Sequence, residues 1–236
     1  MQQGMLFHST FGESDGDYIN QMQVEVAGLD VARFEAAWNA VLQAHDSLRC
    51  AFVWSADQAQ PVQVVLREAR VPFSELDWRG RDDLALALPT LAAEERGRGF
   101  DVLQAPLLRL VLVRLEDDRH ALIYTSHHIL MDGWSNAQLL GEVLQRYCGE
   151  RPTQAAGRFG DYIGWLQRQD PGAPQAVWSG LLASMDGPTL LARRFQPDVV
   201  QLRCNLLDQR AQHSGVLSEL AALDVALKIR RVVLHC

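Results

Sequence analysis

The sequence predicts an α/β fold, in which strands and helices follow one another along the chain. Three observations support this class. Residues 20–28 alternate between apolar and polar side chains, residues 30–49 carry apolar side chains at helical spacing, and residues 106–126 contain two almost continuously apolar runs. The chain has 236 residues, of which 48% are hydrophobic, so it can bury a core as one large domain or two small ones.

The stretch NQMQVEVAG at residues 20–28 is typical of a half-buried strand, because Met22, Val24 and Val26 fall on one face. Gly28 ends this strand, and Asp30 is placed to cap the helix that follows. The apolar face of that helix is formed by residues at helical spacing, namely Phe34, Ala37, Trp38, Val41 and Leu42.

Two pairs of strands are expected next. CAFVW at 50–54 and PVQVVL at 61–66 form the first pair, with SADQAQ as the turn between them, and a polar, helix-prone segment then runs to about residue 98. PLLRLVLVRL at 106–115 and HALIYTS at 120–126 form the second pair, joined by the acidic turn EDD. Because both runs are apolar almost throughout, we expect a hairpin that is buried on both faces.

The second half of the chain is expected to be helical at first. NAQLLGEVLQRYC at 136–148 is amphipathic, with Ser135 as its N-cap, and residues 158–169 and 174–185 indicate two further helices. Residues 193–236 differ, because they contain seven basic and four acidic residues and one aromatic, Phe195. We therefore expect one domain over residues 1–190 and an atypical tail over 191–236, a foreign or truncated continuation that packs weakly or not at all.

Composition excludes several classes of protein. The net charge of -7 argues against a nucleic-acid partner, which would require a basic surface. The N-terminus does not resemble a signal peptide, and no apolar run is long enough to cross a bilayer, so no membrane partner is expected. The four cysteines are scattered, without the paired spacing of a zinc site, which favours a reduced, cytoplasmic setting.

The stretch YTSHHILMDGWS at 124–135 sets His127 and His128 side by side. A lone histidine in an apolar segment is usually a packed, hydrogen-bonded core residue. Two neighbours at a strand end point to opposite faces, so we expect one inside as a support and the other facing a cavity. Histidine suits proton transfer near neutral pH, since its reference pKa is about 6.5. Metal binding is poorly supported, because the pair belongs to no HExxH helix and no third ligand is evident.

Asp132 and Gly133 follow the two histidines. Gly133 allows a tight turn with close backbone approach. Asp132 is either a second catalytic group or a structural acid paired with a buried arginine. Arg49, between Leu48 and Phe52, is the candidate partner, because an arginine inside a core requires a carboxylate.

SHHILMDGWS resembles the HHxxxDG motif of the condensation domains of nonribosomal peptide synthetases. Three other stretches resemble further motifs of that family in the same order: MQQGMLFHS at 1–9, AHDSLRCAF at 44–52 and GRFGDYIGWL at 157–166. Cys50 departs from the family, which often has threonine there. The resemblance covers about residues 1–190. It implies a chloramphenicol acetyltransferase-like fold, a mixed sheet flanked by helices, of which this chain holds only the first of two lobes.

The resemblance implies amide-bond formation between an acyl or peptidyl thioester and an aminoacyl thioester. Both substrates are carried on the phosphopantetheine of peptidyl carrier proteins, so the partners are carrier proteins and adjacent synthetase modules, and no cofactor is bound directly. His128 is then the catalytic residue; it positions or deprotonates the acceptor amine, or stabilises the charged tetrahedral species. His127, Asp132, Gly133 and Arg49 support it, with Asp132 paired to Arg49.

Three alternatives remain open at this stage. An epimerization domain shares the doubled histidine, although the DGWS ending favours condensation. A stand-alone acyltransferase of the same superfamily more often has a single histidine. A non-catalytic fragment or carrier-protein docking module is the third. We expect this chain alone to be inactive, because a tunnel with one wall cannot exclude water or hold two substrates.

Overall fold

The computed structural model describes residues 2–11, 18–53, 61–150, 157–170, 172–184 and 231–235. The chain divides into two units, one formed by residues 1–158 and 214–236 and the other by residues 159–213. The first unit contains the sheets and the first four α-helices. The second unit contains α5 (Phe159–Gln167) and α6 (Gly172–Leu182), close to the two helices expected there.

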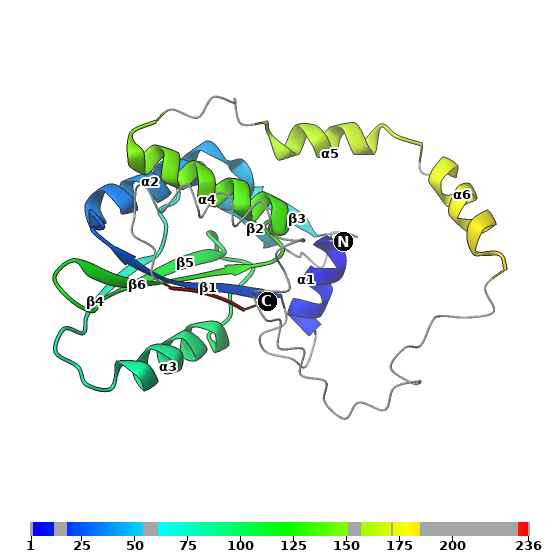
Figure 1. Cartoon of the computed structure of the whole chain (residues 1–236). Coiled ribbons are helices and arrows are strands. Elements are labelled where there is room, and N and C mark those ends of the chain that lie inside the picture. The colour runs from blue at the N-terminus through cyan, green and yellow to red at the C-terminus, as the bar shows by residue number, and fades with distance from the viewer. Residues whose placement is uncertain are drawn as a thin grey trace, which may run out of the picture. The chain divides into compact units, whose positions relative to one another are not determined.

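A five-stranded mixed sheet forms the centre of the first unit, with the strand order β4-β5-β6-β1-β7 (Figure 1). β4 runs parallel to β5, and the other neighbours are antiparallel. The strands are β1 (Ile19–Ala27), β4 (Phe73–Asp77), β5 (Leu108–Arg114), β6 (Arg119–His127) and β7 (Arg231–His235). A separate antiparallel pair, β2 (Cys50–Val53) and β3 (Val62–Val65), confirms the first predicted hairpin.

Helices cover both faces of the large sheet. α2 (Val31–Ala44) and α4 (Gly133–Cys148) lie on one face and α3 (Leu84–Gly97) on the other (Figure 1). The larger core lies beneath α2 and α4, where the rings of Trp38 and Tyr124 are 5.2 Å apart. The smaller core joins α3 to the opposite face of β5 and β6. The predicted burial of this hairpin on both faces is therefore confirmed.

The local patterns of β1 and α2 are largely confirmed. The five apolar residues predicted for α2 are its buried residues, and the Asp30 side chain accepts a hydrogen bond from the Arg33 backbone N–H at 3.0 Å. In β1, Gln21 is an exception to the predicted alternation, because it is buried as well. Its side-chain amide donates to the carbonyl of Ala92 at 2.7 Å and lies 3.2 Å from the hydroxyl of Thr125.

The polar segment before residue 98 contains a strand as well as a helix. β4 was not predicted, because FSELD has little local strand character and is held by parallel pairing with β5 more than thirty residues later. The helix α3 follows it. Arg109 of β5 is buried and anchors the end of α3, since its Nε donates to Glu95 Oε2 at 2.6 Å.

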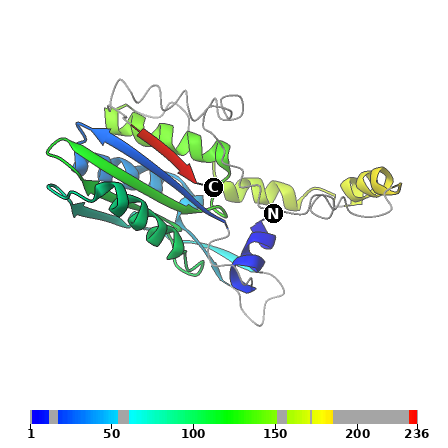
Figure 2. The same cartoon turned by 60° about the horizontal axis from the view of Figure 1, so that its bottom comes forward.

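The end of the chain contains one further strand. Residues 231–235 form β7, which pairs antiparallel with β1 from Gln21↔His235 to Glu25↔Arg231 (Figure 2). The stretch RVVLH contains β-branched residues that suit a strand at the edge of a sheet. The expectation that the tail as a whole packs weakly stays a prediction. Residues 193–230 lie outside the described residues.

Candidate functional site

The two adjacent histidines lie where β6 ends. His127 is the last residue of the strand and is paired with Ile19 of β1. His127 is buried, with 2% of the residue exposed, whereas His128 is only partly buried. The predicted difference between the two environments is therefore present in the structure.

His127 is held as a neutral ring. Its Nδ1 accepts the backbone N–H of Ile129 at 3.0 Å, so the single proton of the neutral ring is on Nε2. Nε2 lies 3.1 Å from Ser9 Oγ and donates to it, and the Ser9 hydroxyl donates to the Met5 carbonyl at 2.8 Å. Burial, and then the neighbouring His128, lower the pKa of His127 to about 4. Such a ring is suited to support rather than to proton transfer at neutral pH.

The first helix, α1 (Gln2–Phe11), contacts the end of β6 and the loop that follows it, residues 128–132. Ser9 reaches His127, and the side-chain amide of Gln2 donates to the carbonyl of Ile129 at 3.0 Å. The N-terminal helix therefore holds the backbone that carries the second histidine.

His128 is held by the beginning of β1. Its backbone N–H donates to the carbonyl of Tyr18 at 2.7 Å, and its Nδ1 lies 3.0 Å from the side-chain nitrogen Nδ2 of Asn20. Among the described residues, none forms a hydrogen bond with Nε2 of His128. The ring is thus fixed at one nitrogen, and the other is available to a ligand.

Asp132 caps helix α4. Its Oδ1 accepts the backbone N–H of Ser135 at 2.8 Å. This hydrogen bond is the main reason why the pKa of the Asp132 carboxyl group lies below its ordinary value. The prediction that Ser135 is the N-cap is therefore wrong. The helix begins earlier, at Gly133, and the carboxylate of Asp132 accepts a hydrogen bond from an N–H of the first turn that has no partner within the helix.

Gly133 does not form the tight turn expected of it. It is already helical, its φ is outside the left-handed region, and a Cβ added there would meet no atom within 4 Å. Within the described residues there is open space beside this position.

Arg49 is not paired with Asp132, and that prediction is wrong. Arg49 is buried, with 7% of the residue exposed, and its Nη2 donates to Asp46 Oδ1 at 2.8 Å. Both residues belong to the short 3-10 helix η1 (Asp46–Arg49), which brings the carboxylate three residues back to the guanidinium. Its other hydrogen bonds go to backbone carbonyls, those of Leu42, Gln43, Leu66 and Arg67. The buried arginine is satisfied without Asp132, which bonds at α4 instead.

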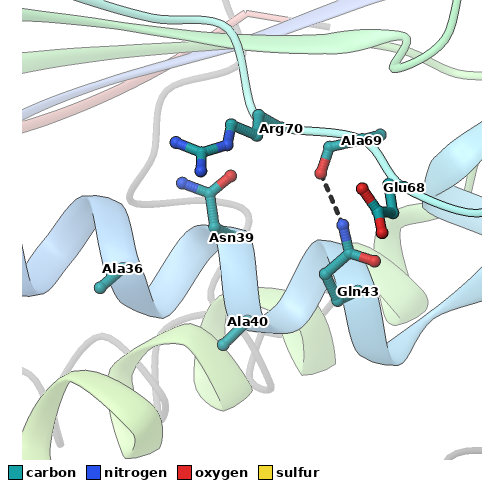
Figure 3. Close-up of a pocket in the computed structure, with 7 residues that line it drawn as sticks. All are labelled: Ala36, Asn39, Ala40, Gln43, Glu68, Ala69 and Arg70. Carbon is teal, nitrogen blue, oxygen red and sulfur yellow. Dashed lines mark hydrogen bonds between the residues drawn. The ribbon is translucent and has the colours of Figure 1, made fainter.

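The rest of the described chain offers few other sites. Its residues contain no group of three or more side chains that could hold a metal ion. No helix in the described ranges is long and apolar enough to cross a membrane. An open hollow lies between α2 and residues 68–70, where Gln43 donates to the carbonyl of Ala69 at 2.7 Å (Figure 3). None of the residues that line it is a predicted site residue.

Comparison with known proteins identifies the family. The sequence profile of the condensation domain matches residues 1–215. The chain belongs to the condensation-domain family. It is 35% identical over 203 residues to bacitracin synthase 3 of Bacillus licheniformis, and the match covers 84% of this chain and 3% of that protein.

Solved structures agree with the predicted fold. The starter condensation domain of rhizomide synthetase RzmA is similar with a TM-score of 0.68 at 23% identity, over 79% of this chain and 47% of that one. The X-domain in its complex with OxyB from teicoplanin biosynthesis is similar with a TM-score of 0.67 at 26% identity, over 80% and 44%. The predicted family and the mixed α/β condensation-domain fold are therefore confirmed. The chain spans less than half of these solved chains.

Three contacts of the site could not be anticipated from the sequence. Ser9, Tyr18 and Asn20 hold the two histidines from 118, 110 and 108 residues away, and the choice of partner depends on how β1 pairs with β6. One indication of these contacts was present in the sequence, because both β1 and β6 were predicted as strands. Pairing them in this register places Asn20 opposite Ser126, two residues before His128.

Proposed function

We propose that this chain is part of a condensation domain that joins an acyl or peptidyl thioester to an aminoacyl thioester. Both substrates would arrive on the phosphopantetheine of peptidyl carrier proteins of the same or adjacent synthetase modules. The observation that carries the proposal is the contrast between the paired histidines: His127 is buried and neutral, with both ring nitrogens bonded, whereas Nε2 of His128 is open. The chain's membership of the family supplies the reaction.

The reaction needs no cofactor bound by this chain. The acceptor amine nitrogen attacks the carbonyl carbon of the donor thioester, a C–N bond forms, and the tetrahedral intermediate collapses with cleavage of the C–S bond. The thiolate of the donor's phosphopantetheine leaves, and the proton lost by the nitrogen ends on that sulfur. The thioester supplies the driving force, so neither a nucleotide nor a metal ion is required by the energetics.

In this proposal His128 acts on the reacting groups, and the others hold it in place. His127 packs beneath the loop, Asp132 fixes the start of α4, and the open space beside Gly133 leaves room for a pantetheine arm. Arg49 supports the fold through Asp46 at η1, and not through the loop.

We further propose that residues 1–190 form the first lobe of the domain, with 191–236 as an atypical continuation, and that this chain alone does not turn over. The chain covers 47% of a solved starter condensation domain. We infer that this share, taken by itself, cannot enclose two substrates in the geometry that the reaction requires. A cytoplasmic location stays a prediction from the cysteine pattern.

A non-catalytic docking module is the second candidate. The likeness to the X-domain, whose structure was solved in complex with another protein, OxyB, favours it. In that case the paired histidines would be dispensable for the chain's role.

The deciding experiment restores the missing part of the domain. Residues 1–190 replace the matching residues of a condensation domain of bacitracin synthase 3, and peptide formation is measured between two loaded carrier proteins. His128→Ala is expected to lower the rate by about 10²–10⁴, the range found when a residue that transfers a proton or stabilises the oxyanion is lost. Gln138→Ala, an exposed change on α4, is the matched control and should leave the rate unchanged.

Three results would contradict the proposal. If the His128→Ala hybrid condenses at the parent rate, His128 has no catalytic role. If the hybrid without this substitution forms no peptide although the parent domain does, the docking module is favoured. If the 236-residue chain alone forms product, the proposed inactivity of the fragment is wrong.

A further inference from the structure

We propose that Asn20 is a positioning residue that fixes His128 in the tautomer with its proton on Nε2, so that His128 meets the reacting groups as a hydrogen-bond donor. This inference rests on the proposed function, because it specifies how the same histidine acts. Asn20 lies outside the four motifs that relate the chain to its family, in residues 1–9, 44–52, 124–135 and 157–166.

The contact between the two side chains determines where the ring proton lies. The nitrogen Nδ2 of Asn20 is 3.0 Å from Nδ1 of His128. An amide nitrogen only donates hydrogen bonds, so Nδ1 must accept with its lone pair. A neutral imidazole has a single N–H, which is then on Nε2.

The backbone keeps this contact in register. The N–H of His128 donates to the carbonyl of Tyr18 at 2.7 Å, and Asn20 lies two residues further along β1. In the antiparallel pairing of β1 with β6, Asn20 is opposite Ser126. Because Nδ1 of His128 is hydrogen-bonded to Asn20 of β1, Nε2 on the other side of the ring is available to a ligand.

The neighbouring ring shows the same tautomer, set by a different donor. Nδ1 of His127 accepts the N–H of Ile129, and its Nε2–H is already bonded to Ser9. Of the two adjacent histidines, only His128 therefore has an N–H with no hydrogen-bonding partner among the described residues.

The tautomer distinguishes the roles that the sequence left open for His128. A general base for the amine must present a lone pair at the cleft, which requires the proton on Nδ1. A ring with its proton on Nε2 presents a donor instead, which is the group that stabilises the oxyanion formed when the amine attacks the thioester. The proton released by the nitrogen then goes to the departing thiolate, and His128 is neither protonated nor deprotonated over the cycle.

The test reads the tautomer directly by ¹⁵N NMR of the histidine rings in the labelled 236-residue chain. His128→Gln identifies the signals of this ring. In the wild type at a pH where the ring is neutral, we expect Nδ1 at the position of an unprotonated ring nitrogen and Nε2 at that of a protonated one. A wild-type ring with its proton on Nδ1 would overturn the inference, and this measurement requires no variant of Asn20.

Asn20→Asp tests whether this residue controls the tautomer. A carboxylate only accepts, so the proton should move to Nδ1 and the two nitrogen signals should exchange character. A carboxylate also favours the imidazolium, so the spectra are compared on the neutral form at the end of a pH titration. Gln23→Glu is the matched control, because it adds the same charge to β1 at a residue with no contact to His128. An unchanged tautomer in Asn20→Asp would overturn the inference.

Activity separates this inference from the proposed function. In the hybrid condensation domain, Asn20→Asp should lower kcat by about 10²–10³, the effect of removing one oxyanion donor, with KM little changed. If kcat is unchanged although the tautomer has moved, the donor role is wrong. If His128→Ala has no effect on the rate while the tautomer is as described, the catalytic role proposed for His128 is wrong, whereas the control of its tautomer by Asn20 is retained.

Discussion

Protonation of His127 is expected to destabilise the folded chain below about pH 6.5. In the fold, Nδ1 must accept the N–H of Ile129 in a buried site, and the imidazolium has no lone pair left to do so. Burial lowers the pKa of His127 to about 4, compared with an ordinary value of 6.5.

The sign and size of the effect follow from these two pKa values. As the pH falls below about 6.5 the unfolded chain takes up a proton at His127, whereas the folded chain does so only near pH 4. Between these limits the unfolded state binds more protons, so the free energy of unfolding decreases as the pH falls. One pKa unit corresponds to about 1.4 kcal/mol, so the loss reaches about 3 kcal/mol at pH 4.

Urea unfolding from pH 8 to pH 4, followed by tryptophan fluorescence, measures this loss against the variant His127→Asn. The asparagine side-chain oxygen can accept the N–H of Ile129 and does not titrate. Other titrating groups, such as His120, whose pKa burial also lowers, contribute to both proteins and cancel in the difference. The stability difference between wild type and variant should shift by about 3 kcal/mol across the range. A difference that does not vary with pH would refute the reasoning.

Two further predictions concern Asp132 at the start of α4 and Arg49 in η1. Asp132→Ala should lower the free energy of unfolding by about 0.5–2 kcal/mol through loss of the helix cap, and Asp132→Asn should keep most of it; equal losses in thermal unfolding would show that the cap is not the reason. In double-mutant cycles, Arg49 and Asp46 should couple by about 0.5–3 kcal/mol, whereas Arg49 and Asp132 should be additive within about 0.5 kcal/mol. Additivity of Arg49 with Asp46 would contradict the ion pair.

Features that depend on local periodicity could be predicted from the sequence. The buried face of α2, its cap at Asp30 and the hairpin formed by β5 and β6 are all encoded within about twenty residues. The different environments of His127 and His128 were also predicted, because neighbouring residues at a strand end point to opposite sides; His127 is the last residue of the buried strand, and His128 lies just beyond it.

Features that depend on the pairing of segments far apart in the chain could not be predicted from the sequence. β4 is a strand because β5 is beside it, and Asn20 and His128 meet because β1 pairs with β6 in one particular register. The predicted pairing of Arg49 with Asp132 was wrong for a different reason. The short 3-10 helix η1 was not predicted, and it brings Asp46, three residues away, to the guanidinium.

β6 ends at His127 and His128 follows it directly, so this strand should not tolerate changes in its length. Successive strand residues face opposite sides, so deleting one residue between 119 and 126 would move His128 into the interior position of His127 and bring Ile129 to the open one. Substitutions along the strand alter its packing, whereas an insertion or deletion changes which side chain occupies the exposed position at its end. Libraries that diversify this region should therefore vary residue identity at constant length, and natural homologues should show gaps in the EDD turn rather than in the strand.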